Sequence, residues 1–144
     1  MMLPTTSFES VGRRIMIVDD DLNEMRSMVL GLKMEGFCVD GVTNGEDALA
    51  SLEERAYAAV IIDLMMPDMN GLQLARAIKN NHPAVKTILM SAYHLSSAQL
   101  SRADAGISGF IPKPFCFDEL VVFVNQKLNP TSNMPIRTNE TLTP

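Results

Sequence analysis

The chain has 144 residues, of which 47% are hydrophobic, so it can bury the core of one ordinary domain. Its 17 acidic and 12 basic residues give a net charge of −5, which excludes a uniformly basic surface for binding nucleic acid directly or for lying on an anionic membrane. Cys38 and Cys116 have no metal-binding spacing and the chain has no signal-peptide pattern or long apolar run, so we expect a cytoplasmic protein without a zinc site or disulfide framework.

Five short apolar runs alternate with stretches of helical periodicity, which is the pattern of a parallel sheet with crossover helices. Three of the runs are nearly all apolar instead of alternating, as expected of strands that are covered on both faces. In chain order the predicted strands are Ile15–Val18, Phe37–Val42, Ala59–Ile62, Val85–Met90 and Gly109–Ile111.

Five helices are predicted between and after these strands, and several have recognisable ends. Thr43 with Glu46 and Ser96 with Gln99 have the spacing of capping boxes. Gly36 follows the first helix as a stop signal. The last helix contains a run of β-branched residues with strand propensity, but its apolar residues have helical spacing. The predicted helices are Leu22–Glu35, Asn44–Arg55, Gly71–Asn80, Ser96 to about Ala105, and Phe117–Leu128.

Polar residues follow the strands where each one ends. Asp19, Asp20 and Asp21 follow the first strand, and Asp63, Ser91 and Lys113 follow the third, fourth and fifth. The carboxyl ends of parallel strands form the ligand crevice of an open α/β sheet, so these side chains are expected to meet. Clustered carboxylates repel one another and favour a hard divalent cation with oxygen ligands, for which Mg²⁺ is the first choice and Mn²⁺ the second.

Four motifs carry these residues: IMIVDD, VIIDLMMPDMNG, ILMSA and FIPKPF. In order and context they resemble the receiver domain of two-component response regulators. The resemblance implies a flavodoxin-like, doubly wound (βα)5 three-layer sandwich with a parallel five-stranded sheet in the order 2-1-3-4-5. It covers residues 13–128, which leaves residues 1–12 as an N-terminal extension and residues 129–144 as a polar tail or linker stub.

The resemblance also implies a role for each site residue. Asp63 would accept the phosphoryl group, with Ser91 and Lys113 contacting its oxygens. Mg²⁺ would be bound directly by Asp20, Asp63 and the backbone carbonyl of Met65, with Asp19 acting mainly through a bound water. The Lys113–Pro114 peptide would be cis, as is typical at this position of the family.

Further residues would switch the domain or tune its kinetics. Ser91 and Phe110 would rearrange on phosphorylation and change the surface of the fourth helix, fifth strand and fifth helix, although Phe110 is equally well explained as a core residue. Met65 and Tyr93 flank the site, and their bulk predicts slow self-dephosphorylation.

Two features of the sequence leave alternatives open. The apolar phase of the first helix arrives one residue late, so the acidic pair is either Asp19 with Asp20 or Asp20 with Asp21. The third carboxylate would then cap the helix. In the last helix Val122 and Phe123 cannot both face the sheet, which predicts exposed apolar area and a surface for a partner or homodimer.

The function predicted is that of a signalling switch and not of an enzyme. Its partners would be a sensor histidine kinase or phosphotransfer protein and a downstream effector or output domain. A flavodoxin-like redox module is disfavoured because three acids would repel a flavin phosphate, and an aspartyl-phosphate hydrolase because Met65 stands where its second acid is needed. An unphosphorylated interaction scaffold on the same fold stays open.

Overall fold

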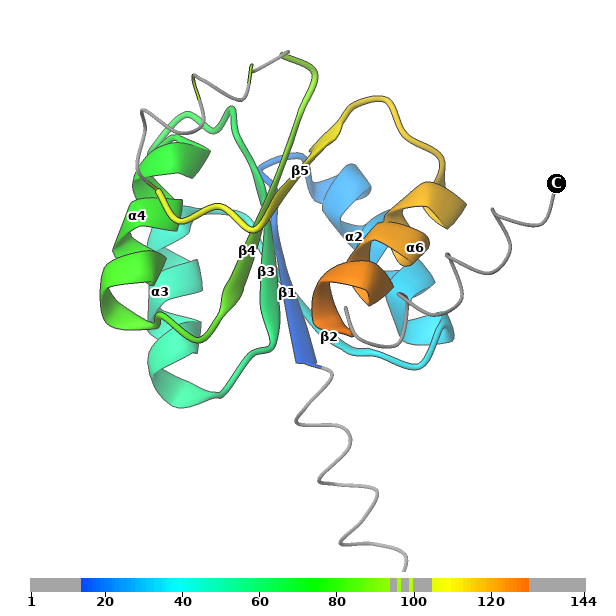
Figure 1. The fold of residues 1–144 in the computed structure, drawn as a ribbon, viewed down its shortest axis with the longest axis horizontal. Helices are drawn as coiled ribbons and strands as arrows, with labels where there is room; N and C mark the ends of the chain where they lie inside the picture. The colour runs from blue at the N-terminus through cyan, green and yellow to red at the C-terminus, as the bar shows by residue number, and fades with distance from the viewer. Residues whose placement is uncertain (1–13, 94–95, 97–98, 100–104, 130–144) are drawn as a thin grey trace, which may run out of the picture.

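The computed structural model describes residues 14–93, 96, 99 and 105–129. Within them, a parallel sheet is covered by helices on both faces (Figure 1). The strands are β1 (Arg14–Val18), β2 (Cys38–Val42), β3 (Ala59–Asp63), β4 (Lys86–Ser91) and β5 (Gly109–Pro112). The helices are α2 (Leu22–Met34), α3 (Gly45–Glu54), α4 (Gly71–Asn81) and α6 (Phe117–Leu128).

The sheet has the strand order β2-β1-β3-β4-β5 with every neighbouring pair parallel. Both the order and the flavodoxin-like α/β class are therefore as predicted. The chain moves outward in opposite directions from β1, so the order reverses between β1 and β3. In folds of this kind, ligands bind beyond the carboxyl ends of the strands at such a reversal, so the ends of β1 and β3 are the place to look for a site.

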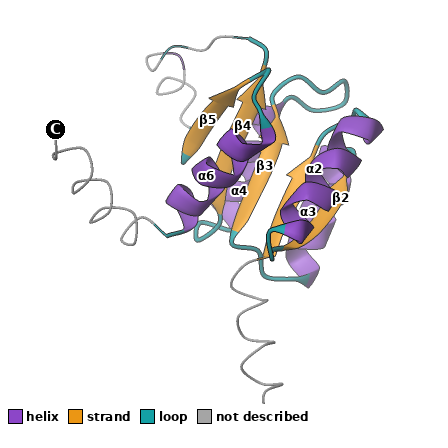
Figure 2. Cartoon of the chain, turned by 90° about the vertical axis from the view of Figure 1, so that its right-hand side faces the viewer, coloured by secondary structure: helices purple, strands orange, loops and turns teal. Residues whose placement is uncertain are grey.

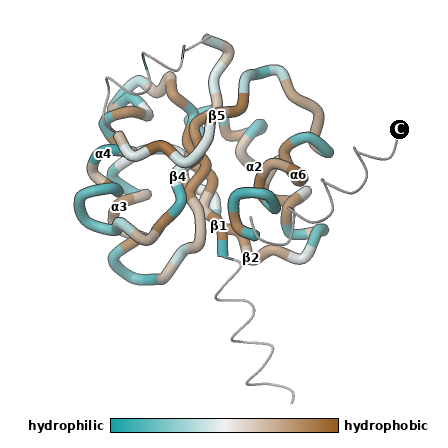
Figure 3. The backbone as a smooth tube through the Cα atoms, in the orientation of Figure 1, coloured by the Kyte–Doolittle hydropathy of each residue, from teal (hydrophilic) through white to brown (hydrophobic). Residues whose placement is uncertain are grey.

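Helices α3 and α4 cover one face of the sheet, and α2 and α6 cover the other (Figures 1 and 2). Successive residues of β1 supply the two faces in turn: Met16 and Val18 pack under α3 and α4, while Ile15 and Ile17 pack under α2 and α6. All four are fully buried. Figure 3 accordingly shows hydrophobic residues along the central strands and hydrophilic ones on the outer parts of the helices. This two-sided burial explains why the strand sequences are continuously apolar.

Helix α2 ends as its sequence predicts, whereas the prediction for the start of α3 is wrong by one residue. Gly36 has a positive φ of 99° just beyond α2. The cap of α3 is Asn44 and not Thr43, because the Asn44 side chain accepts a 2.7 Å hydrogen bond from the Asp47 amide and donates a 3.0 Å bond to its carboxylate. Asparagine caps a helix at least as well as threonine, so the reciprocal pair forms one residue later.

The predicted fourth helix can be compared with the structure only in part, and the last helix can be compared in full. The predicted fourth helix lies mostly outside the described residues, but its capping box is present: Ser96 and Gln99 exchange amide-to-side-chain hydrogen bonds of 2.8 and 3.1 Å. The last helix has the predicted bounds, with Leu120 and Val124 buried and Val122 exposed. Of the extension and tail, the structure describes Asn129 alone.

Candidate functional site

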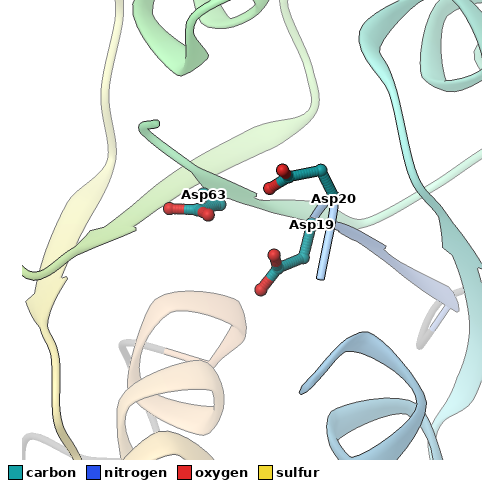
Figure 4. Close-up of side chains that lie close together, drawn as sticks. All are labelled: Asp19, Asp20 and Asp63. Carbon is teal, nitrogen blue, oxygen red and sulfur yellow. The ribbon is translucent and has the colours of Figure 1, made fainter. Parts of the chain in front are cut away.

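The carboxylates of Asp19, Asp20 and Asp63 meet at the crevice between β1 and β3 (Figure 4). Asp63 is the last residue of β3, and Asp19 and Asp20 follow directly after β1. One oxygen from each of the three lies within 4.8 Å of the others. Asp19 and Asp63 are buried, whereas Asp20 is exposed. The pocket therefore offers three oxygen ligands to a cation, with one side open to solvent.

Asp21 points to a different task. Its side chain accepts a 3.1 Å hydrogen bond from the amide of Glu24 and caps α2. Of the two acidic pairs that the sequence allowed, the structure thus gathers Asp19 with Asp20, and the third carboxylate is the helix cap.

The Asp19 carboxylate is placed where a counter-ion is needed. Its Oδ1 accepts a hydrogen bond from the Asp21 amide at 3.0 Å, but its buried Oδ2 has no hydrogen-bond partner in the described part of the chain. Burial raises the pKa of Asp19 to about 7, and the neighbouring Glu24 carboxyl adds to the rise. A buried oxygen of this kind without a hydrogen bond costs free energy. A cation bound here would remove that cost.

Lys113 brings positive charge to the same pocket. Its Nζ lies 3.6 Å from Asp19 Oδ2 and 3.8 Å from Asp63 Oδ2. Its backbone amide donates a 2.8 Å hydrogen bond to the carbonyl of Ser91, which ties the turn after β5 to the end of β4. The Lys113–Pro114 peptide is cis, as predicted. The hydrogen bond to Ser91 thus places the backbone of Lys113 at the edge that holds the carboxylates.

Asp63 itself is 8% exposed, and its Oδ1 accepts a 3.3 Å hydrogen bond from the Met65 amide. Burial raises the pKa of Asp63, while the charge of Lys113 acts in the opposite direction. The effect of burial is the stronger of the two, so the pKa of Asp63 is raised without a bound cation. A second positive charge beside the lysine would favour the ionised, nucleophilic form.

Other predicted residues surround this centre. Ser91 is buried at the end of β4, and its Oγ accepts a 2.9 Å hydrogen bond from the Tyr93 amide. The side chains of Met65 and Tyr93 are exposed at the rim. Phe110 on β5 is half-buried against the core under α3 and α4. Ser91 is thus at the same edge of the sheet as Asp63, and Phe110 lies on β5, the strand that pairs with β4.

Sequence reasoning missed Glu24, whose Oε1 lies 2.7 Å from Lys113 Nζ. The two residues are 89 positions apart. The neighbouring Asp19 carboxyl and the hydrogen bond from Lys113 both lower the pKa of Glu24. An acidic residue in the first turn of a helix usually signals only a favourable interaction with the helix dipole, so the pattern gave no hint of this contact.

The fold and the pocket define a flavodoxin-like α/β domain with an acidic cluster at its switch point. A family model described as the response regulator receiver domain matches residues 15–125. The chain therefore belongs to the response regulator receiver family. This assignment agrees with the motifs of the sequence.

Curated relatives and solved structures agree with the assignment. The response regulator MprA of Mycobacterium sp. (strain KMS) is 30% identical over 83% of this chain and 52% of its own length. PrrA of Mycobacterium tuberculosis, a transcriptional regulatory protein, is 29% identical over 90% of this chain and 56% of its own. The chain spans about half the length of these relatives.

Two solved receiver structures match over most of the described fold. A CheY-like receiver domain protein from Methanospirillum hungatei has a TM-score of 0.77 and 27% identity, with 85% of this chain and 98% of the other covered. The response regulator TrrA from Thermotoga maritima, solved in complex with Mg(2+)-BeF, has a TM-score of 0.71 and 33% identity over 80% of this chain and 98% of its own. Within the described residues, no helix has the length and apolar character needed to cross a membrane.

Proposed function

We propose that this domain is a phosphorylation switch that accepts a phosphoryl group on Asp63. The observation that carries the proposal is the environment of that carboxylate: Asp19 and Asp20 lie beside it and Lys113 Nζ lies 3.8 Å away. Transfer of a phosphoryl group requires an aligned nucleophile and charge stabilisation at the phosphoryl oxygens more than it requires a general base. Asp63 is the nucleophile and Lys113 supplies positive charge, while Asp19 and Asp20 would supply more through a cation that they bind.

A divalent cation fits the acidic side of the pocket. The ligands would be Asp19, Asp20, Asp63 and the backbone carbonyl of Met65, and oxygen ligands of this kind suit Mg²⁺, with Mn²⁺ as the alternative. Asp19 Oδ2 is buried, has no hydrogen-bond partner among the described residues and lies 3.6 Å from Lys113 Nζ, beyond hydrogen-bonding distance, which supports this fit. When bound, the ion would supply positive charge that offsets the carboxylates and the incoming phosphoryl oxygens.

The remaining residues act on the phosphoryl group directly. With acetyl phosphate as donor, a carboxylate oxygen of Asp63 forms the new bond to phosphorus. The bond from phosphorus to the acetyl oxygen breaks, and its electron pair leaves with acetate. Lys113 neutralises one phosphoryl oxygen, and the hydroxyl of Ser91 donates a hydrogen bond to another. To do so, Ser91 turns its hydroxyl proton toward the new group while its oxygen still accepts from the Tyr93 amide.

The same contact with Ser91 would move the end of β4 and switch the domain. Phe110 on the adjacent β5 would turn further into the space that opens, burying more of its ring without a new hydrogen bond. The altered surface would comprise the predicted fourth helix (Ser96 to about Ala105), β5 and α6. Val122, which is 55% exposed on α6, supports a partner or homodimer surface there.

The domain would act as a signalling switch in the cytoplasm and not as an enzyme, apart from catalysing its own phosphorylation and slow dephosphorylation. Its donor would be a sensor histidine kinase or a phosphotransfer protein, and its reader an effector or an attached output domain. The net charge of −5 disfavours direct binding to nucleic acid or an anionic membrane.

The test is intact-mass detection of one added phosphoryl group after incubation with acetyl phosphate. We expect the mass gain in the wild type with Mg²⁺, and no gain in Asp63→Asn or after chelation. Asp21→Asn is the matched control, because it removes the same charge nearby and asparagine still caps α2. A wild type that folds but gains no mass under any of these conditions would favour the unphosphorylated scaffold.

A further inference from the structure

Lys113 is bound more closely by Glu24 than by the carboxylates of the acidic pocket. Its Nζ is 2.7 Å from Glu24 Oε1, against 3.6 Å from Asp19 Oδ2 and 3.8 Å from Asp63 Oδ2. Only the first of these is a hydrogen-bonding distance for a charged pair. In this state the ammonium group is therefore held toward α2 and away from the phosphoryl-accepting oxygen.

The position of Glu24 follows from local structure. Asp21 caps α2 and fixes where its first turn begins, which brings Glu24 opposite the turn after β5. Glu24 and Lys113 both line a cavity of about 420 Å³ between α2 and the start of α6, with Met28, Phe115 and Phe117 on its apolar wall. The ion pair thus lies at the edge of this cavity.

We infer that Glu24 is a positioning residue that holds Lys113 in the unphosphorylated domain and releases it to the phosphoryl group. The inference rests on the proposed function and adds a competitor for the lysine to it. A phosphoryl group on Asp63 would bring new negative charge to the pocket, and Lys113 would exchange one anionic partner for another. Breaking the ion pair between Glu24 and Lys113 is then part of the free-energy change of phosphorylation.

Exposure makes this exchange feasible. The Glu24 side chain is 43% exposed, whereas Lys113 is 17% exposed and Asp19 is fully buried. When the lysine leaves, Glu24 is rehydrated by the adjacent cavity, so no unpaired charge is left buried. An ion pair with one partly exposed member contributes little free energy, which allows it to be broken by a stronger anion.

Two different roles for Glu24 would have distinct consequences. If it were a fourth carboxylate ligand of the metal, its removal would weaken cation binding, but the three carboxylates that lie within 4.8 Å of one another do not include it. If it served only the dipole of α2, its removal would lower stability and leave the lysine unaffected.

The experiment compares Glu24→Gln with the wild type and with Glu54→Gln, an equal charge change at the exposed end of α3. The first readout is the NMR signal of the Lys113 ε-methylene and ammonium group without cation or phosphodonor. We expect it to shift in Glu24→Gln and to be unchanged in Glu54→Gln. An unchanged Lys113 signal in both variants would overturn the inference, whether or not the domain can be phosphorylated.

The second readout is the affinity for beryllofluoride at saturating Mg²⁺, measured together with the affinity for Mg²⁺ alone. We expect Glu24→Gln to bind beryllofluoride about two- to fivefold more tightly, because an ion pair of this exposure no longer competes for Lys113. Its Mg²⁺ affinity should fall by less than about twofold. Glu24→Asp keeps the charge on a shorter side chain, so its affinity for beryllofluoride should lie between those of the wild type and Glu24→Gln.

The outcomes separate the inference from the proposed function. A wild type that binds neither Mg²⁺ nor beryllofluoride would contradict the proposed function. A wild type that binds both, with Glu24→Gln indistinguishable from it, would reject the inference alone. Loss of Mg²⁺ affinity in parallel with beryllofluoride affinity would identify Glu24 as a metal ligand instead.

Discussion

The backbone carbonyl of Asp63 occupies the space in which a side chain at position 71 would begin. A Cβ built on Gly71 would lie 2.8 Å from that oxygen and 2.8 Å from the Cα of Leu64. The amide of Gly71 donates a 2.8 Å hydrogen bond to the Leu64 carbonyl, so the start of α4 is pressed against the end of β3. Glycine is therefore required at position 71 by the close approach of the backbone at the end of β3.

We predict that Gly71→Ala destabilises the domain by about 1–3 kcal/mol, because backbone atoms on both sides must shift to admit the methyl group. The shift also displaces Asp63, so phosphorylation by acetyl phosphate should slow. Urea unfolding and the rate of mass gain measure the two effects.

Gly31→Ala is the control for this substitution. Its Cβ would lie even closer to a neighbour, 2.5 Å from the Phe117 ring, but that ring can turn aside. In addition, alanine gains about 1 kcal/mol over glycine inside a helix. A loss of stability in Gly31→Ala as large as that in Gly71→Ala would contradict the distinction between backbone and side-chain contact.

We predict that Asn44→Ala lowers the free energy of unfolding by about 0.5–2 kcal/mol, the usual effect of removing a helix cap. Thr43→Ala should cost less than Asn44→Ala, because Asn44 makes the cap hydrogen bonds to Asp47. Thermal or urea unfolding of both variants checks this. A larger loss in Thr43→Ala than in Asn44→Ala would instead support the capping box of Thr43 and Glu46 that the sequence predicts.

The outcome at Asn44 illustrates which features could be predicted from sequence. Strand and helix positions follow from burial on one or both faces, and burial leaves a periodic pattern that can be read without coordinates. The site could be located for the same reason, because Asp19, Asp63 and Lys113 each come at the carboxyl end of an apolar run that is predicted as a strand. The choice between adjacent caps depends on hydrogen-bond geometry, for which Thr43 and Asn44 are nearly equivalent in sequence.

The contact between Glu24 and Lys113 could not be predicted for a related reason. The two side chains come from elements far apart in sequence, and their meeting depends on the entry angle of α2 and on two flexible side chains. Neither property has a periodic signature. The close approach at Gly71 could not be predicted either, because a close backbone approach and a positive φ both favour glycine and cannot be distinguished by its presence alone.

The two faces of α6 provide a test of its helical phase. Leu120 is fully buried and Val122 is 55% exposed. We predict that Leu120→Ala costs about 2–5 kcal/mol of stability, through lost burial and the cavity left behind. Val122→Ala should change stability by less than about 0.5 kcal/mol. Chemical denaturation measures both, and a large loss in Val122→Ala would place that residue inside the core.

Tyr57 makes the domain sensitive to alkaline pH. Burial, together with a 2.6 Å hydrogen bond to Asp40, raises the pKa of Tyr57 from 10.0 to about 12. Between these values the folded domain keeps a proton that the unfolded chain has lost. Stability is therefore complete below pH 10 and decreases as the pH rises toward 12, by at most about 1.4 kcal/mol per pH unit.

The absorbance of tyrosinate tests this directly, since the chain has two tyrosines and no tryptophan. In a Tyr93→Phe background, the remaining phenol should titrate near pH 12 in the folded protein. Tyr57→Phe should remove this contribution to the pH dependence and cost about 1 kcal/mol at neutral pH through the lost hydrogen bond. A phenol that titrates near pH 10 while the protein stays folded would disprove the shift.

The lifetime of the proposed acyl phosphate should depend on Met65 and Tyr93. Their side chains are 52% and 60% exposed at the rim of the pocket, where hydrolytic water must approach. Both are bulky, and a thioether cannot hold a water molecule well, so we predict slow self-dephosphorylation in the wild type. An asparagine at position 65 could position a water with one hydrogen bond, worth about 0.5–1.5 kcal/mol, which corresponds to an acceleration of about two- to tenfold.

Loss of the added mass over time measures the rate in wild type and Met65→Asn. Met65→Leu, which keeps the bulk and adds no polar group, should match the wild type, and a Met65→Asn rate no faster than that of Met65→Leu would show that hydrolysis is limited elsewhere.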